Sequence, residues 1–336
     1  MRYINIDSFN KNSMTLAKDI IDTQGHILVS KSSDLTEERI HRLIELGITS
    51  IYINDSWSKD LLINPSISQE LINKSMNSLS NMDIDSIKQC SSELVDNLLE
   101  STSKMYDIAT LREYDEYTLQ HCINVAIYAI TLGIGLGIEY SRLKKLASGA
   151  LLHDIGKGSI SINIINKAGK LTPDEIDIIK KHPQIGYNLL KDNMMISSSE
   201  RAIIYQHHEN YDGSGYPRGL KNDEIYELAM ITHVCDVYDA LISKRSYKKA
   251  LKYSEAIDIM KSYRGTLFNP EILDAFFKYV PIYYQGTTVI LNNEEEALVV
   301  KNNRGNVLQP VIKLKNNKII DLSKQENPSN ILKIVS

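Results

Sequence analysis

The sequence predicts a multidomain, mainly helical protein with a small N-terminal α/β domain and a small C-terminal β extension. Three observations carry this prediction. Residues 113–280 show long helical periods and few strand-like runs, residues 1–63 mix β-like runs with one amphipathic helix, and short alternating runs follow Pro281. Residues 64–112 are polar and lie between the first two regions as a helical linker.

The composition is that of a folded protein without a bias toward nucleic acid. The 336 residues are 43% hydrophobic and 24% charged, and the formal net charge is −4. A general DNA- or RNA-binding protein would usually be basic, so we expect this protein to bind neither DNA nor RNA. Three cysteines, Cys90, Cys122 and Cys235, have no CxxC spacing and are expected to be reduced thiols.

Nothing in the sequence predicts a secretory signal or a membrane span. The first residues lack an apolar signal core, and the most apolar run, Val125 to Ile138, is shorter than the roughly 20 residues that a bilayer span needs. We therefore expect this run to be a buried helix and the protein to be cytoplasmic.

The two terminal regions each contain recognisable elements. In residues 1–63 the runs HILVS and SIYIN favour strands, and LTEERIHRLIELGI has apolar residues near a helical period. In residues 281–336 the runs TTVILN, EALVVKN, QPVIKLK and KIIDLS are separated by Asn, Gly and Pro, which is typical of a small β unit.

The linker, residues 64–112, has apolar residues at helical spacing. A seven-residue pattern begins at Ile84, but Ser91 and Ser101 interrupt it, so a regular coiled coil is not expected. Two alternatives stay open: a connecting helix that docks on the next domain, and a helix that forms a homodimer.

Six of the eight histidines lie in the helical region, and several have acidic or histidine neighbours. In LLHDIGKGSI an apolar stretch leads to His153 and Asp154, where we expect a helix to end and the chain to turn at Gly156. Imidazole and carboxylate together suit a divalent ion such as Fe or Mn. Lys157 follows closely enough to place an ammonium near an anion bound to that ion.

Further candidate ligands follow at separations that fit one or two helices and a loop. Successive helices could therefore bring them to one cavity. The seven candidates are His121, His153, Asp154, His182, His207, His208 and Asp236. Seven ligands exceed the four of a structural zinc site and predict two ions, bridged by Asp154 and a solvent hydroxide. Two-metal centres of this kind activate water for attack on phosphorus, so phosphodiester hydrolysis is the expected chemistry.

The motifs HDIGK, HPQIG, HHENYDGSGYP and CDVYDALISKRSYK, in this order, resemble those of the HD-GYP phosphodiesterases, a branch of the HD superfamily. The resemblance covers about residues 113–280. It implies an all-helical domain of a bacterial enzyme that hydrolyses cyclic di-GMP to pGpG and in some members on to GMP.

Carried over to this sequence, the resemblance assigns the same seven residues as metal ligands. It makes Asp154 the bridging catalytic carboxylate and implies that Lys157 contacts the scissile phosphate or protonates the leaving oxygen. Arg245 and Lys248 match positions that hold substrate phosphate. Some members bind a third metal through a Glu four residues before the first histidine. Here that position is Tyr117, so two metals are expected.

The stretch HHENYDGSGYPRGL combines ligands with a signature loop. We expect Glu209 and Asp212 to orient the histidines, as partners of metal ligands do. The resemblance places the loop of Gly215, Tyr216 and Pro217 at the rim of the site, available for contacts with partners such as GGDEF-type cyclases.

The flanking regions also resemble segments found beside HD-GYP domains. Two other functions stay open from the sequence. One is hydrolysis of 3′3′-cyclic GMP-AMP, and the other is a non-catalytic cyclic-dinucleotide sensor or scaffold that acts through the GYP loop. The sensor class usually shows broken ligand motifs, whereas all seven ligand positions are kept here.

Overall fold

The structure, a computed structural model, describes residues 1–21, 26–46, 48, 50–63, 66–102, 117–167, 169–243, 253–325 and 331–334. The chain forms two compact units. Unit 1 comprises Met1–Asn73, Glu100–Glu116 and Pro281–Ser336, and unit 2 comprises Lys74–Leu99 and Tyr117–Val280. The chain passes from unit 1 into unit 2 within one helix, α2 (Gln69–Ser80).

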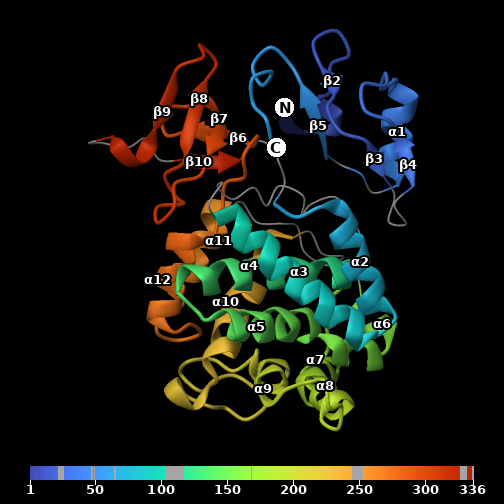
Figure 1. Ribbon diagram of the computed structural model, residues 1–336, viewed down its shortest axis with the longest axis vertical. Helices are drawn as coiled ribbons and strands as arrows, with labels where there is room; N and C mark the ends of the chain where they lie inside the picture. The colour runs from blue at the N-terminus through green and yellow to red at the C-terminus, as the bar shows by residue number, and fades with distance from the viewer. Residues whose placement is uncertain are drawn as a thin grey trace. The chain divides into compact units, whose positions relative to one another are not determined.

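The N-terminal part of unit 1 has the expected α/β character (Figure 1). Its elements are β1 (Arg2–Asn5), η1 (Ile6–Ser8), β2 (Thr15–Leu16), β3 (Ile20–Ile21), β4 (Ile27–Val29), α1 (Glu37–Glu45) and β5 (Ser50–Asn54). The strands form an antiparallel sheet in the order β1-β5-β2 and a separate β3-β4 pair. Thr36 caps α1, and the apolar Leu43 of that helix joins a core with Ile4, Ile51 and Ile53.

The C-terminal part of unit 1 is the expected β unit. Its elements are β6 (Thr288–Leu291), β7 (Glu296–Lys301), β8 (Val311–Leu314), β9 (Ile319–Asp321), η4 (Leu322–Lys324) and β10 (Ile331–Ile334), and the sheet order is β10-β6-β7-β8-β9. Contacts join it to the N-terminal part. The Trp57 indole donates to the Leu314 carbonyl at 3.1 Å, the Lys313 ammonium donates to the Trp57 carbonyl at 3.0 Å, and the Tyr3 amide donates to the Gly286 carbonyl at 2.9 Å.

Apart from one isolated bridge between Arg264 and Phe268, the regular secondary structure in the described residues of unit 2 is helical. Besides the end of α2 it contains α3 (Ile84–Thr102), α4 (Tyr117–Gly135), α5 (Tyr140–Leu152), η2 (Ile155–Ser159), α6 (Ile162–Ile165), α7 (Pro173–Ile179), α8 (His182–Leu190), α9 (Ser198–Gln206), η3 (Asn222–Glu224), α10 (Glu227–Ile242), α11 (Tyr253–Ser262) and α12 (Pro270–Tyr279).

The apolar run predicted as a buried helix is the centre of unit 2. It forms most of α4, whose residues from Ile123 to Leu132 are almost entirely buried, and α4 contacts α5, α10 and α12. A helix that is apolar on all sides needs neighbours on all sides, so α4 serves as the core around which the other helices pack. No helix among the described residues is long and apolar enough to cross a membrane.

The apolar stripe of α3 is buried within the chain. Ile87, Leu94 and Leu98 are at most 1% exposed, and so is the interrupting Ser91, whose hydroxyl donates to the Ile87 carbonyl. This burial favours the docking alternative for the linker helix over a dimer seam.

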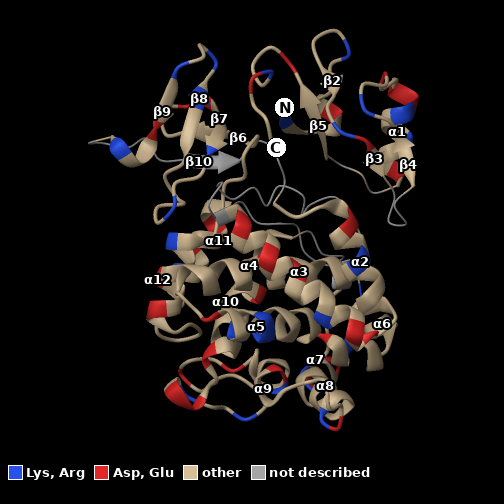
Figure 2. Ribbon diagram, in the orientation of Figure 1, with Lys and Arg blue, Asp and Glu red and all other residues tan. Residues whose placement is uncertain are grey.

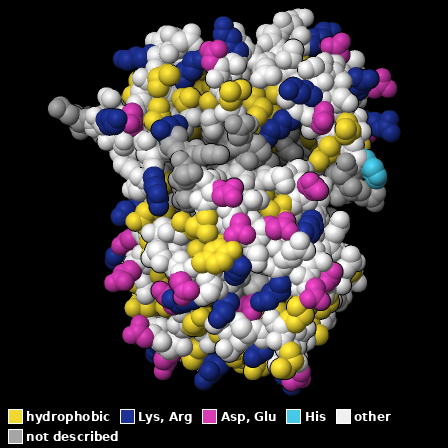
Figure 3. Space-filling view, viewed as in Figure 1, with side chains coloured by type: hydrophobic (Ala, Val, Ile, Leu, Met, Phe, Trp, Pro, Cys, Tyr) yellow, Lys and Arg dark blue, Asp and Glu magenta, His cyan; other side chains and the backbone are white. Residues whose placement is uncertain are grey.

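The charged side chains are mixed in sign along the ribbon (Figure 2). On the face drawn in Figure 3 histidine is visible only on unit 1. In the described part of unit 2, five of the six histidines are at most 5% exposed, and these are His121, His153, His182, His207 and His233.

Candidate metal centre

The seven predicted ligands converge in the interior of unit 2. They come from the N-terminal part of α4, the end of α5, the start of α8, the end of α9 and the middle of α10. Two groups form around one aspartate, with the ligand atoms of each set within 4.8 Å of one another. These sets are Asp154 with His182, His207 and His208, and His121 with His153 and Asp236.

Asp154 lies between the two groups and turns one oxygen toward each. Its Oδ1 is 3.3 Å from the Nε2 of His182 and 3.8 Å from that of His207, whereas its Oδ2 is 3.5 Å from the Nε2 of His153 and 3.8 Å from that of His121. We call His182, His207 and His208 the Oδ1 group, and His121, His153 and Asp236 the Oδ2 group. One carboxylate with an oxygen in each group is placed to bridge two ions.

Three histidines are held in the same tautomer by the backbone carbonyl three residues before each of them. The Nδ1 of His153 donates to the carbonyl of Ala150 at 2.6 Å, and His182 and His207 make the equivalent bond to the carbonyl three residues earlier, at 2.8 and 2.9 Å. With the proton on Nδ1, the Nε2 lone pair of each ring is left for a metal ion.

His121 is fixed by a residue that the sequence analysis missed. Its Nδ1 contacts the Oδ2 of Asp239 at 2.7 Å, and the amide of Asn124 donates to the other Asp239 oxygen at 2.9 Å. On its Nε2 side, His121 is 3.0 Å from the Oδ1 of Asp236. Asp239 follows Asp236 by three residues on α10, so the same-face spacing of two acids was the available signal.

The electrostatics of the two groups differ. Burial lowers the pKa of His207 and His208 well below the ordinary value and also lowers that of His153. Burial opposes charge on His121 too, but Asp236 and Asp239 outweigh it and raise its pKa to about 9. These directions give neutral imidazoles at His153, His207 and His208 and a charged pair of His121 and Asp236.

Both candidate carboxylate ligands are ionised. Burial would raise the pKa of Asp154, but Lys157 and the neighbouring histidines hold it well below the usual range. Burial likewise opposes ionisation of Asp236, whose pKa is held well below its usual range chiefly by His121. Both side chains therefore present anionic oxygens, as metal ligation requires.

Close backbone packing explains why the fourth position of the HDIGK motif is a glycine, Gly156. A Cβ at Gly156 would lie 2.0 Å from the carbonyl oxygen of His182, so no larger residue fits where η2 crosses the start of α8. This contact brings Asp154 and His182 within ligand distance of each other. The chain turn expected after His153 is confirmed: α5 ends at Leu152 and η2 begins at Ile155.

Lys157 reaches back to the bridging carboxylate. Its ammonium donates to the Oδ2 of Asp154 at 2.5 Å, and its side chain is 23% exposed. Lys157 therefore places a positive charge at the edge of the buried ligand cluster, where an incoming anion can reach it.

The GYP loop packs directly on a candidate ligand. The Tyr216 ring stacks on His208 with centroids 4.8 Å apart, and the Tyr216 amide donates to the His208 carbonyl at 3.0 Å. A Cβ at Gly215 would lie 2.2 Å from the Asn210 amide nitrogen, so this tight approach requires glycine. Tyr216 therefore forms one wall beside His208.

The two residues expected to orient the histidines shape the loop instead. The buried carboxylate of Glu209 accepts hydrogen bonds from the amides of Arg218 and Leu220, at 2.7 and 3.0 Å. Asp212 is exposed and accepts from the Ser214 amide, which is an Asx turn. The expectation for Asp212 is corrected, because an exposed turn residue does not set the orientation of a buried ring.

Three predicted positions have no described side chain. Arg245 and Lys248 lie outside the described residues, and so does the side chain of Tyr117, although its backbone begins α4. Their expected roles stay predictions.

The residues present fit a divalent metal. Among the described residues, the buried Nε2 of His153 and Oδ1 of Asp154 have no hydrogen-bond partner. Such atoms cost free energy when they are left unsatisfied in the interior. Imidazole nitrogens and carboxylate oxygens at ligand spacing would be satisfied by ions, so the clusters could bind divalent metal.

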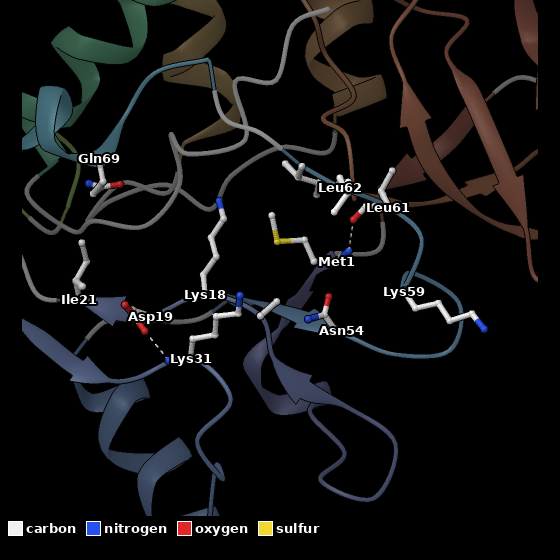
Figure 4. A pocket seen from close by; sticks show the side chains of 12 residues that line it. Met1, Lys18, Asp19, Ile21, Lys31, Asn54, Lys59, Leu61, Leu62 and Gln69 are labelled. Carbon is white, nitrogen blue, oxygen red and sulfur yellow. Dashed lines mark hydrogen bonds between the residues drawn. The ribbon is translucent and has the colours of Figure 1, made fainter.

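Unit 1 holds a pocket of different chemistry, with a volume of about 850 Å³. Lys18, Lys31 and Lys59 contribute ammonium groups to its lining, together with apolar side chains such as Leu61 (Figure 4). The Met1 ammonium at its edge donates to the carbonyls of Ser58 and Leu61 at 2.8 and 2.5 Å. This lining offers cations rather than imidazoles and does not suit a metal ion.

Several curated proteins resemble this chain. The cyclic di-GMP phosphodiesterase PA4108 of Pseudomonas aeruginosa is 36% identical over 227 residues, which cover 66% of this chain and 55% of that protein. The cyclic di-GMP phosphodiesterase response regulator RpfG of Xanthomonas campestris is 42% identical over 144 residues, covering 43% of this chain and 38% of the relative. The 3′3′-cGAMP-specific phosphodiesterase 2 of Vibrio cholerae is 32% identical over 194 residues, covering 57% and 35%. The chain therefore spans about half or less of the length of these relatives.

The fold also has a solved counterpart. The structure of Bd1817, described as an HDG"Y"P protein from Bdellovibrio bacteriovorus, matches 82% of this chain and 97% of its own length with a TM-score of 0.54 at 19% identity. A model of the HD domain matches residues 93–272, more than half of the sequence and including all seven clustered ligands. The chain belongs to the HD-domain family, in the HD-GYP branch whose motifs it carries.

Proposed function

We propose that this protein is a metal-dependent phosphodiesterase that hydrolyses cyclic di-GMP. The observation that carries the proposal is the position of Asp154, with one oxygen toward each group of buried ligands. The similarity to proteins named cyclic di-GMP phosphodiesterases supports the substrate.

Two divalent ions, of Fe or Mn, are proposed to bind here. Asp154 would be their shared ligand, with the Oδ1 group holding one ion and the Oδ2 group the other. When bound, such ions polarise a phosphoryl oxygen and lower the pKa of water, which supplies the nucleophile at neutral pH. The fixed Nδ1 protons of the histidines preorganise the ligands, so little rearrangement is needed on binding.

The residues of the chain provide the remaining chemistry. Water attacks phosphorus, the bond from phosphorus to the 3′ oxygen breaks, and the departing oxygen takes up a proton. The Lys157 ammonium, next to Asp154 and partly exposed, is proposed to stabilise the charge on that oxygen and to donate the proton. Arg245 and Lys248 are proposed to hold the second phosphate, which positions the first one at the cluster.

The GYP loop and the linker are proposed to serve partners. Tyr216 is partly exposed and lies on His208, so a protein bound to the loop, such as a GGDEF-type cyclase, would act beside the cluster. A homodimer through residues 64–112 would need a surface of α3 other than its buried stripe.

The test is turnover by full-length protein purified without oxygen, together with metal analysis. We expect about two metal ions per chain and conversion of cyclic di-GMP to pGpG, with GMP as a later product. Asp154→Ala should bind less metal and be inactive. Full metal content with retained turnover in this variant would overturn the assignment of Asp154.

A second substrate has support from one group of relatives. Two proteins of Vibrio cholerae named as 3′3′-cGAMP-specific phosphodiesterases are 32% and 35% identical to this chain. Assaying both cyclic dinucleotides at equal concentration separates the candidates through the ratio of their kcat/KM values. If a metal-loaded protein bound either dinucleotide without turnover, the sensor function would replace the enzymatic one.

A further inference from the structure

A buried carboxylate outside the metal cluster connects the linker helix to two helices that carry ligands. Glu200 on α9 is 0% exposed. Its Oε1 accepts from the ammonium of Lys88 on α3 and from the hydroxyl of Ser148 on α5. Its Oε2 accepts from the amide and the hydroxyl of Ser197, at 2.8 and 2.7 Å, in a capping box that begins α9.

Two of these helices end at the metal cluster. The last turn of α5 leads directly into His153 and Asp154, and α9 leads into His207 and His208. Helices α5 and α9 also contact each other along their lengths. A shift of either helix along its axis would therefore move ligands of both groups relative to one another.

The third helix comes from the linker. Helices α2 and α3 form a hairpin in which the Lys74 ammonium donates to Glu93 at 2.8 Å, and the chain enters unit 2 within α2. Lys88 is 30% exposed, whereas Glu200 is fully buried. Because an unpaired buried charge is strongly disfavoured, α9 and α3 are expected to keep this ion pair and to move together.

We infer that Glu200 is a positioning residue through which the α2–α3 hairpin sets the alignment of α5 and α9, and thereby the affinity of the cluster for metal. The inference rests on the metal centre of the proposed function but not on its substrate. It connects unit 1 to the cluster through the backbone of the hairpin and then through the Lys88–Glu200 ion pair, because α2 begins in unit 1 and α3 carries Lys88.

The test is binding of Mn²⁺ to the full-length, metal-free protein, with amide hydrogen exchange of α9 as a second measurement. Lys88→Met should weaken Mn²⁺ binding by about 2- to 30-fold and speed exchange in residues 198–206. Lys88→Arg keeps the cation and should restore most of the affinity. Neither measurement uses a cyclic dinucleotide, so a failure of the proposed hydrolysis would not affect the outcome.

The matched control is Lys74→Met. This change removes the Lys74–Glu93 ion pair between α2 and α3 and leaves the Lys88–Glu200 pair in place. It should leave Mn²⁺ affinity and α9 exchange at the wild-type values. Equal effects of the two methionine variants would overturn the inference, since they would indicate general loosening of the hairpin.

A double-mutant cycle checks that Lys88 acts through Glu200. Glu200→Gln keeps hydrogen-bonding groups for Ser148 and Ser197 but removes the charge. Once that charge is gone, Lys88→Met should have little further effect on Mn²⁺ affinity, so the double variant should resemble Glu200→Gln alone. Additive losses would contradict the proposed connection. Thermal unfolding of each variant identifies any that fails to fold.

Discussion

The two groups of ligands on either side of Asp154 share that carboxylate but differ in charge. The Oδ1 group consists of three imidazoles, of which His207 and His208 have lowered pKa values because they are buried. The Oδ2 group contains the ionised Asp236 and contacts a second carboxylate, Asp239, through His121. One buried cluster thus offers a nitrogen-rich position and a more anionic one.

Because of this difference, the Oδ1 group and the Oδ2 group are expected to bind metal ions with different affinities. Imidazole ligands suit borderline ions such as Fe, whereas added carboxylate favours harder ions such as Mn. His121, whose pKa is raised to about 9, must also lose its shared proton before its Nε2 can bind. Occupation of the Oδ2 group is therefore expected to release a proton and to depend more strongly on pH.

The largest effect is expected from Asp154→Ala, which removes the residue common to both groups. Both positions lose a ligand, so metal content and turnover of cyclic di-GMP should fall together, turnover by at least about 1,000-fold. Metal analysis and a product assay measure this. Asp274→Ala is the control, because that aspartate is 58% exposed in a surface pair with Arg264.

Removing one histidine from each group tests whether the two groups are separate metal sites. His182→Ala and His153→Ala should each lower metal content by about one ion per chain and turnover by at least about 100-fold. His41→Ala, a change at a 79% exposed side chain, should do neither. If either cluster variant kept both ions, the division into two groups would be wrong.

Asp239→Asn should affect the Oδ2 group alone. The amide keeps the shape of the side chain but not its charge, so the pKa of His121 should fall below about 9. Metal affinity should weaken by about 10- to 100-fold for one ion of the two. Histidine proton resonances followed against pH in the metal-free protein report the first effect, and metal titration reports the second. An unchanged pKa would show that Asp236 alone holds the His121 proton.

The smallest expected effect is on the stability of the metal-free protein. The pKa values of His153, His207 and His208 lie below the unfolded value of 6.5, so the unfolded chain binds more protons as the pH falls past 6.5, and stability decreases. The contribution of His121 to the pH dependence of stability has the opposite sign. Its raised pKa contributes stability that is complete below 6.5 and is lost as the pH rises through about 9.

Urea unfolding of chelator-treated protein between pH 5 and pH 9 measures both slopes. We expect the free energy of unfolding to fall more steeply on the acid side, because three histidines lower it there and one lowers it on the alkaline side. A stability that is flat from pH 7 to pH 5 would mean that His153, His207 and His208 are not held neutral by burial.

Much of this architecture was predictable because its signals are local. Helical periods in residues 113–280 and alternating runs after Pro281 predicted the mainly helical region and the C-terminal sheet, and both are present. The seven candidate ligands were recognisable because metal chemistry restricts residue types, and the structure brings all seven together. The apolar run Val125 to Ile138, too short for a bilayer span, also indicated a buried helix, and its residues as far as Gly133 are buried.

What the sequence by itself determined was therefore which residues are candidate ligands, and which segments form helices and strands. Only the tertiary structure decided how the candidate ligands are divided into two groups around Asp154. The surroundings of Asp154, the contact of Asp239 with His121 and the pair of Lys88 with Glu200 join residues from different helices, and Tyr216 packs on His208 across the GYP loop. The same holds for the contacts of Trp57 with the C-terminal sheet. Sequence patterns report the period of one element, whereas such contacts depend on how several elements pack, and no local pattern encodes that packing.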